Sequence, residues 1–178
     1  MKITPSLSLS PNFALREFTR SETAKKHQLY NLPRDVSEIA NLKALCDAVL
    51  EPIRALFGRP VIITSGFRCV TLNRLIGGAP TSQHLYGEAA DIIVAGLKTE
   101  YAARTLAAHP DLPFDQLIYE ARERADGSFA KWVHISHKRQ GENRREALTI
   151  LIGKGGKRVL TGIHPADTAP NSAESTEA

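Results

Sequence analysis

Hydrophobic positions recur every three or four residues over residues 35–57, the clearest periodic stretch of the chain. This spacing predicts a helix with one apolar stripe. Asp35 or Ser37 can cap its start, and Gly58 follows its last apolar residues as a normal stop. Pro52 has no backbone N–H, so we expect it to kink the helix or split it in two. The stripe consists of Val36, Ile39, Leu42, Leu45, Val49, Ile53 and Leu56.

Short apolar runs rich in β-branched residues follow this helix and predict strands. The predicted strands are 60–64, 89–94, 114–120 and 132–136, with a hairpin of 148–152 and 157–160. Shorter helical segments are predicted within 7–32, at 70–76 and over 98–108. A helix-first order followed by strands with few helices favours the α+β class, with a small, mainly antiparallel sheet and helices packed on it.

Length and composition indicate one globular domain. The 178 residues are 42% hydrophobic and 24% charged, which is enough apolar material for a core. We expect a single domain over residues 1–160, with its motifs concentrated in 60–137. Residues 161–178 are mostly Pro, Ala, Ser, Thr and acidic residues, and this composition predicts a disordered tail.

Several protein classes are disfavoured by simple counts. Two cysteines cannot build a disulfide scaffold or a four-thiolate zinc site. No apolar run reaches the roughly 18 residues of a membrane span, so we expect no stable membrane insertion. The first 13 residues hold one lysine and no apolar core, so we expect cytoplasmic synthesis without a signal peptide. Action on a cell wall would then require release or export by another route.

The net charge of +4 raises the question of an anionic partner. Residues 1–137 are nearly balanced, with 16 Lys and Arg against 14 Asp and Glu, whereas 138–158 hold seven basic residues against two Glu. Because the basicity is local and aromatic residues total only 6%, we expect no nucleic-acid binding. The basic segment is interpreted either as an aid to attachment to an anionic envelope or as a solvated hairpin edge.

The densest polar cluster runs from Ser82 to Asp91. A turn at Gly87 followed by an extended segment can bring His84 and Asp91 to one point. In the strand 132–136, His134 alternates with apolar neighbours that point into the core, so it can face a cleft. Each of these residues alone is more often structural than functional. Together, two histidines and one aspartate with an open position suit a catalytic zinc site.

Such a site also needs a proton carrier and a substrate anchor. Glu120 ends the strand before that of His134, so it can stand near the metal without being a ligand. Glu88 is the rival, but strand alternation over three residues would put it on the opposite face from Asp91. Arg68 follows the first strand, where its guanidinium can clamp a carboxylate. The same sequence would also fit a turn that carries a surface arginine.

Four sequence blocks in this order resemble the zinc D-alanyl-D-alanine carboxypeptidase family, a group that includes phage L-alanyl-D-glutamate endolysins. The blocks are SGFRCVTLN, GGAPTSQHLYGEAADI, FDQLIYE and WVHIS. With NFALREFTRSETA and the helix up to LEPIRALFG, the resemblance covers about residues 8–137 and is closest to a branch of small single-domain members. It implies the zinc fold shared by hedgehog domains and D-Ala-D-Ala peptidases.

The resemblance assigns roles residue by residue. The SxHxxGxAxD and WxHxS blocks imply that His84, Asp91 and His134 are zinc ligands, with one Zn²⁺ per chain. The arginine of SGxR falls on Arg68, which implies substrate binding and polarisation of the carbonyl. Many members carry an acidic residue three positions before the last histidine, where this chain has Lys131. The small-domain branch instead implies Glu120 as the acid/base.

The implied activity is that of a zinc-dependent metallopeptidase hydrolysing peptide bonds in peptidoglycan stem peptides. Ser82 and Gln83 can supply hydrogen bonds to the substrate backbone. We expect a monomer, with a phage or prophage lysin as one setting. Whether it is a D-Ala-D-Ala carboxypeptidase or a cell-wall endopeptidase stays open, because both would use the same ligands. The alternative is a catalytically inactive, zinc-containing module that binds cell wall or a phage structure.

Overall fold

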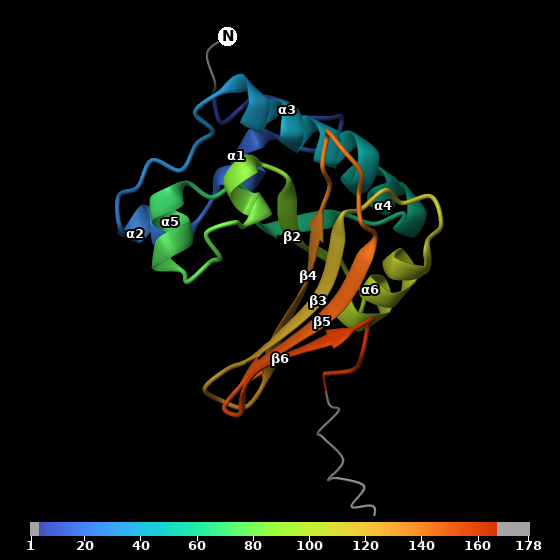
Figure 1. The fold of residues 1–178 in the computed structure, drawn as a ribbon. Coiled ribbons are helices and arrows are strands. Elements are labelled where there is room, and N and C mark those ends of the chain that lie inside the picture. The colour runs from blue at the N-terminus through green and yellow to red at the C-terminus, as the bar shows by residue number, and fades with distance from the viewer. Residues whose placement is uncertain (1–3, 167–178) are drawn as a thin grey trace, which may run out of the picture.

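A six-stranded sheet in the order β1-β2-β4-β3-β5-β6 forms the centre of the computed structural model, which describes residues 4–166 (Figure 1). The strands are β1 (Val61–Ser65), β2 (Ala89–Val94), β3 (Gln116–Glu123), β4 (Phe129–Ser136), β5 (Glu146–Gly153) and β6 (Gly156–Thr161). All neighbouring pairs are antiparallel except β3 and β5. The predicted α+β class with a mainly antiparallel sheet is confirmed.

Helices cover one face and one end of this sheet (Figure 1). They are α1 (Leu15–Thr19), α2 (Glu22–Lys26), α3 (Val36–Leu45), the π-helix η1 (Cys46–Leu50), α4 (Glu51–Phe57), α5 (Val70–Leu75), the 3-10 helix η2 (Gln83–Tyr86) and α6 (Thr99–Ala108). Helix α6 packs against β2, β3 and β4. Among residues 4–166, none of the helices combines the length and apolar character needed to cross a bilayer.

The predicted long helix is present with the expected ends. The Asp35 carboxylate accepts hydrogen bonds from the backbone N–H groups of Ser37 and Glu38, and Gly58 closes the helix at a φ of 58°. The helical segment formed by α3, η1 and α4, here called the α3–α4 rod, continues through Pro52. The turn before this proline widens into η1, where Glu51 N–H bonds to the carbonyl of Cys46 five residues back. This π segment accommodates a residue that cannot donate its own helical hydrogen bond.

Strand alternation separates a core face of the sheet from an open face. Side chains on the core face are buried against α6 and the α3–α4 rod. They include Ala90, Ile92, Leu117, Tyr119, Ala121, Val133 and Ile135. The alternate residues, such as Asp91, Glu120 and His134, share the opposite face, because strand side chains alternate. The polar residues of the sequence motifs therefore gather on the face that the core leaves free.

The end of the domain continues past β6. Ala166 is buried and Ile163 packs against the core. The rest of the predicted tail, residues 167–178, lies outside the described residues.

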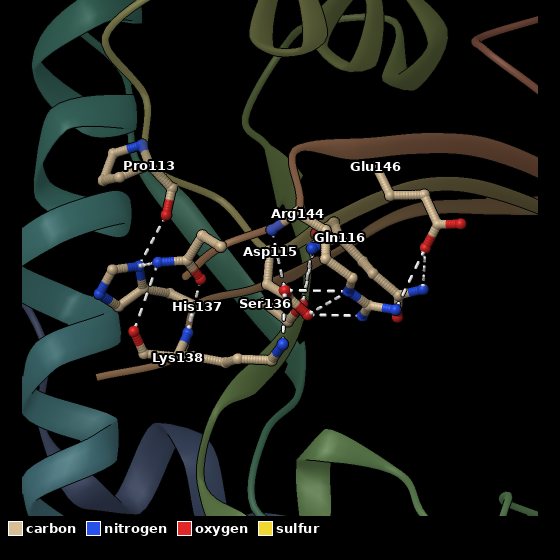
Figure 2. Close-up of polar contacts among 9 residues, drawn as sticks. Pro113, Asp115, Gln116, Ser136, His137, Lys138, Arg144 and Glu146 are labelled. Carbon is tan, nitrogen blue, oxygen red and sulfur yellow. Dashed lines mark hydrogen bonds and ion pairs between the residues drawn. The ribbon is translucent and has the colours of Figure 1, made fainter. Parts of the chain in front are cut away.

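The loop that leads into β5 is held by a buried carboxylate, that of Asp115 (Figure 2). Its oxygens accept hydrogen bonds from Nε and Nη2 of the Arg144 guanidinium, and Lys138 Nζ lies 3.1 Å from Oδ1. Arg145 donates to the backbone carbonyls of Leu112 and His109. Three of the seven basic residues of 138–158 thus fix this loop to the domain. The Asp115 side chain is fully buried, whereas those of Lys138 and Arg144 stay partly exposed to water.

Replacing Asp115 with Asn is expected to lower the free energy of unfolding by about 2–3 kcal/mol, less than for a fully buried pair because the Arg144 side chain is half-exposed. Burial alone would raise the pKa of Asp115, but hydrogen bonds from Arg144 and Lys138 hold it well below its usual range. The stabilisation is therefore complete above the unfolded pKa of about 4 and is lost as pH falls below it.

Urea unfolding of both forms between pH 7 and pH 3 measures this difference. Asp111→Asn is the matched control, because Asp111 is exposed in the turn after α6 and should change stability by less than about 0.5 kcal/mol. Equal stability of Asp115→Asn and the control at pH 7 would show that the buried carboxylate does not anchor the loop.

Candidate metal centre

A left-handed turn joins the two ends of the Ser82–Asp91 motif. His84 lies in η2, Gly87 follows with a φ of 72°, and β2 begins two residues later. A Cβ added at Gly87 would lie 2.6 Å from the carbonyl oxygen of Glu38 in α3. The turn therefore needs glycine for its backbone conformation and for its close approach to α3. It turns the chain so that His84 and Asp91 meet, as predicted.

Gly87→Ala should lower the free energy of unfolding by more than about 2 kcal/mol, because a left-handed residue costs about 1–2 kcal/mol and the clash with a backbone atom adds to this. Gly127→Ala is the control. Gly127 also has a positive φ, of 81°, but an added Cβ there meets no atom of residues 4–166 within 4 Å. Denaturant melts of the two variants separate the clash from the conformational cost. Equal losses would contradict the packing argument.

Strand register places the second and third residues of the cluster. Asp91 of β2 is directly paired with His134 of β4, so their side chains share a face. On the other side of β2, the pairing with β1 slips at Thr64, and Ser65 becomes the partner of Asp91. Such a bulge redirects the side chains that follow it. It carries the chain from β1 toward Arg68, beside the same carboxylate.

His84, Asp91 and His134 form a tight, buried cluster. His84 Nε2 lies 3.2 Å and His134 Nδ1 lies 3.0 Å from Oδ1 of Asp91. The two imidazole nitrogens are 3.1 Å apart. One ligand atom from each residue thus points at a common centre, and all three residues are buried.

The hydrogen bonds of His84 fix which of its ring nitrogens faces the cluster. Its Nδ1 lies 2.6 Å from the carbonyl oxygen of Gly66, so Nδ1 carries the proton and Nε2 turns a lone pair toward the cluster. Burial lowers the pKa of His84, which keeps the ring neutral. Burial alone would raise the pKa of Asp91, but its interactions with both histidines hold it below the usual range.

A neutral imidazole and a carboxylate therefore face each other as two acceptors, 3.2 Å apart. A cation between them removes this repulsion. Two imidazoles and one carboxylate are ligands that Zn²⁺ takes in catalytic sites, and the fourth position is left for water or substrate. The cluster fits zinc binding.

Arg68 contacts the cluster through the second oxygen of Asp91. Its Nη2 lies 2.7 Å from Oδ2, and its Nε donates to Ser65 Oγ at 3.0 Å. This contact leaves Oδ1 of Asp91 for the centre. The sequence interpretation expected Arg68 to reach the substrate and did not foresee its bond to Asp91. It also missed Ser65 and Gly66, which orient Arg68 and His84 from within the same SGFR block.

Glu120 stands beside the cluster on the same face. It pairs with Trp132, two residues before His134 on β4, and it lines the same cavity. Burial, together with the nearby Asp91 charge, raises the pKa of Glu120. Within residues 4–166 its carboxylate makes no hydrogen bond or ion pair. Lys131 lies three residues before His134 on β4, so its side chain is on the opposite face, where it is exposed.

The alternation argument against Glu88 is wrong. Glu88 precedes the first residue of β2, so it belongs to the turn, where strand alternation does not apply. It lines the same cavity as Asp91 and Glu120, and burial raises its pKa. Both carboxylates are therefore candidates for proton transfer by position.

An open cavity of about 1080 Å³ contains the cluster. Ser82 and Gln83 line it, as does Arg68. The amide of Gln83 is buried near the carboxylate of Glu88, and neither its nitrogen nor its oxygen makes a hydrogen bond of good geometry within residues 4–166. Buried polar atoms are usually paired, so this amide is available to a bound molecule.

Comparison with known proteins agrees with this geometry. A stretch of 44 residues is 46% identical to the zinc D-Ala-D-Ala carboxypeptidase of Streptomyces albus G, covering 24% of this chain and 17% of that relative. The chain therefore matches less than a fifth of the relative's length. The model of the Peptidase M15 family matches residues 11–136, which include every residue of the cluster. That match spans more than half of the 178 residues, and the chain belongs to the Peptidase M15 family.

Proposed function

We propose that this protein is a zinc-dependent peptidase that hydrolyses peptide bonds in peptidoglycan stem peptides. The observation that carries the proposal is one cavity holding the His84–Asp91–His134 cluster with Glu120 beside it. Membership of the family supports hydrolysis of a peptide bond. The carboxypeptidase named as a relative supports the class of substrate.

Each residue has a task in the proposed reaction. His84, Asp91 and His134 would hold the metal, which supplies a Lewis acid for the scissile carbonyl and for water. Glu120 takes a proton from the attacking water and gives it to the nitrogen of the leaving amine, so that a carboxylate and an amine result. Its raised pKa suits it to accept and return that proton.

Arg68, Ser82 and Gln83 orient the substrate. Nη1 of Arg68 makes no hydrogen bond within residues 4–166, so it can donate to the carbonyl oxygen or a terminal carboxylate of the peptide. The amide of Gln83 can both donate to and accept from a peptide backbone. Ser82 precedes it at the cavity wall and offers a hydroxyl.

We place the activity at the cell wall, performed by a monomer carrying one zinc ion, with a phage or prophage lysin as one setting. The bond cut is either the terminal D-Ala-D-Ala bond or an internal bond of the stem peptide.

Digestion of purified peptidoglycan by the zinc-loaded protein, followed by mass analysis of the soluble fragments, distinguishes these two bonds. Free D-Ala identifies a carboxypeptidase, whereas a released peptide of two or more residues without free D-Ala identifies an endopeptidase. Bound zinc with no fragment released would instead support a cell-wall-binding module.

A further inference from the structure

The cavity extends well beyond the metal cluster, over strands that lie outside the family match. β5 and β6 follow residue 136, the last residue matched, yet Ile150, Ile152 and Lys157 line the same cavity as His84 and His134. In Figure 1 the β3–β4 and β5–β6 hairpins run together away from the helices. The open face of the sheet thus continues from the cluster to the hairpin ends.

Two cations stand at this far end. Arg122 pairs with Ile152, and Ile152 pairs with Lys157, so the three residues lie abreast on β3, β5 and β6. Neighbouring strands are about 4.8 Å apart, which puts the Cα atoms of Arg122 and Lys157 about 10 Å apart. Both long side chains line the cavity, and they can close on one anion above Ile152.

The other cations of the cavity are already paired. Arg68 is bonded to Asp91, while Lys138 and Arg144 share Asp115. Arg122 and Lys157, in contrast, make no ion pair within residues 4–166. Of the described acidic residues that line the cavity, only Glu120 lies on the same strand face near Arg122, two residues away. The hairpin end therefore carries a net positive charge, and Glu120 is the nearby described acid that acts on Arg122.

We propose that Arg122 and Lys157 bind a carboxylate of the substrate that is remote from the scissile bond. This inference rests on the proposed function for the identity of the substrate. Ile150 and Ile152 form an apolar floor, with Ile150 beside Glu120 and Trp132 and with Ile152 between the two cations. The favoured substrate is thus an acidic peptide that lies extended along β3.

The register sets the distance between the two ends. Ile118 pairs with His134, and Arg122 is four residues further along β3, which corresponds to about 14 Å. An extended peptide covers this distance in about four residues. A peptide whose scissile carbonyl lies at the cluster would therefore pass Glu120 and bring a carboxylate several residues away within reach of both cations.

Binding and cleavage of two synthetic stem peptides test this inference. One peptide keeps its side-chain carboxylates, and the other carries them as primary amides. Dissociation constants are measured by calorimetry with zinc-loaded Glu120→Gln. This variant prevents cleavage during the measurement, and its neutral side chain cannot change protonation state when a peptide binds. We expect the acidic peptide to bind about tenfold more tightly, the effect of two exposed ion pairs. Salt near 1 M should remove most of this preference.

Adding Arg122→Gln and Lys157→Gln should abolish the preference while leaving the affinity for the amidated peptide unchanged. The matched control adds Arg124→Gln and Lys131→Gln. It removes the same charge from the β3–β4 hairpin at positions that do not line the cavity, and it should keep the tenfold preference. Equal binding of the two peptides, binding of neither, or a preference that survives loss of Arg122 and Lys157 would overturn the inference.

Cleavage by the wild-type protein is scored separately. A charge preference in binding without cleavage of either peptide would refute the peptidase proposal and leave the anion site standing. Cleavage of both peptides without a charge preference in binding would support the peptidase proposal and refute the anion site.

Discussion

His84→Ala should abolish zinc binding and peptide cleavage together. The variant removes one of the three ligand atoms, and it also removes the ring whose Nδ1 is fixed by the Gly66 carbonyl. Loss of a partner that only orients a ligand lowers metal affinity by about 10- to 100-fold, so loss of the ligand itself should cost more than about a hundredfold. Competition with a zinc chelator measures the affinity.

His27→Ala is the matched control, because His27 is an exposed histidine in a turn after α2. It should bind zinc as the wild type does. If His84→Ala keeps wild-type zinc affinity while its circular dichroism is unchanged, the cluster is not the metal site.

Glu120→Gln should separate the two properties that His84→Ala removes together. The amide keeps the shape of the side chain but cannot take up the proton of the attacking water. General acid–base catalysis contributes about 10²- to 10⁴-fold, and the rate constant kcat should fall by that factor. Zinc affinity should stay within about threefold of wild type, because Glu120 is not one of the three clustered ligands. Zinc titration and stem-peptide hydrolysis on the same preparation give both numbers.

Glu88→Gln decides between the two carboxylates of the cavity. Both are partly buried and have raised pKa values, so position and titration alone do not rank them. Glu120 lies two residues from the register partner of His134, whereas Glu88 lies at the turn before β2. We expect Glu88→Gln to keep kcat within about tenfold of wild type. A larger loss than that of Glu120→Gln would transfer the proton-carrying role to Glu88.

The half of the centre formed by His84 and Asp91 is local and could be predicted from the sequence, whereas the place of His134 in it was implied by the resemblance to the family. A glycine between His84 and Asp91 predicted the turn, and alternation in WVHIS predicted the direction of His134; the structure brings all three side chains together. These features need only the periodicity of strands and the backbone freedom of glycine. The same periodicity gave a wrong prediction for the face of Glu88, because the first residue of β2 could not be located from the sequence.

Contacts between distant segments were harder to predict. The bulge at Thr64 and the bond from Arg68 to Asp91 depend on the register of β1 against β2, which no local pattern reveals. The parallel pairing of β5 with β3 likewise joins distant segments, and beside it Asp115 meets Arg144 across 29 residues. Asp115 beside Phe114 at the start of the predicted strand 114–120 was the available signal, since a buried carboxylate needs a cation.

The most direct test of the central claim is removal and return of the metal. Purified protein is treated with a chelator, dialysed and assayed for hydrolysis of a synthetic stem peptide before and after zinc is added. We expect cleavage to disappear with the metal and to return in full at about one zinc per chain, as a single three-ligand site requires. Cleavage that persists in the metal-free protein, or full zinc loading that restores none, would contradict the assignment of this cluster as a catalytic zinc site.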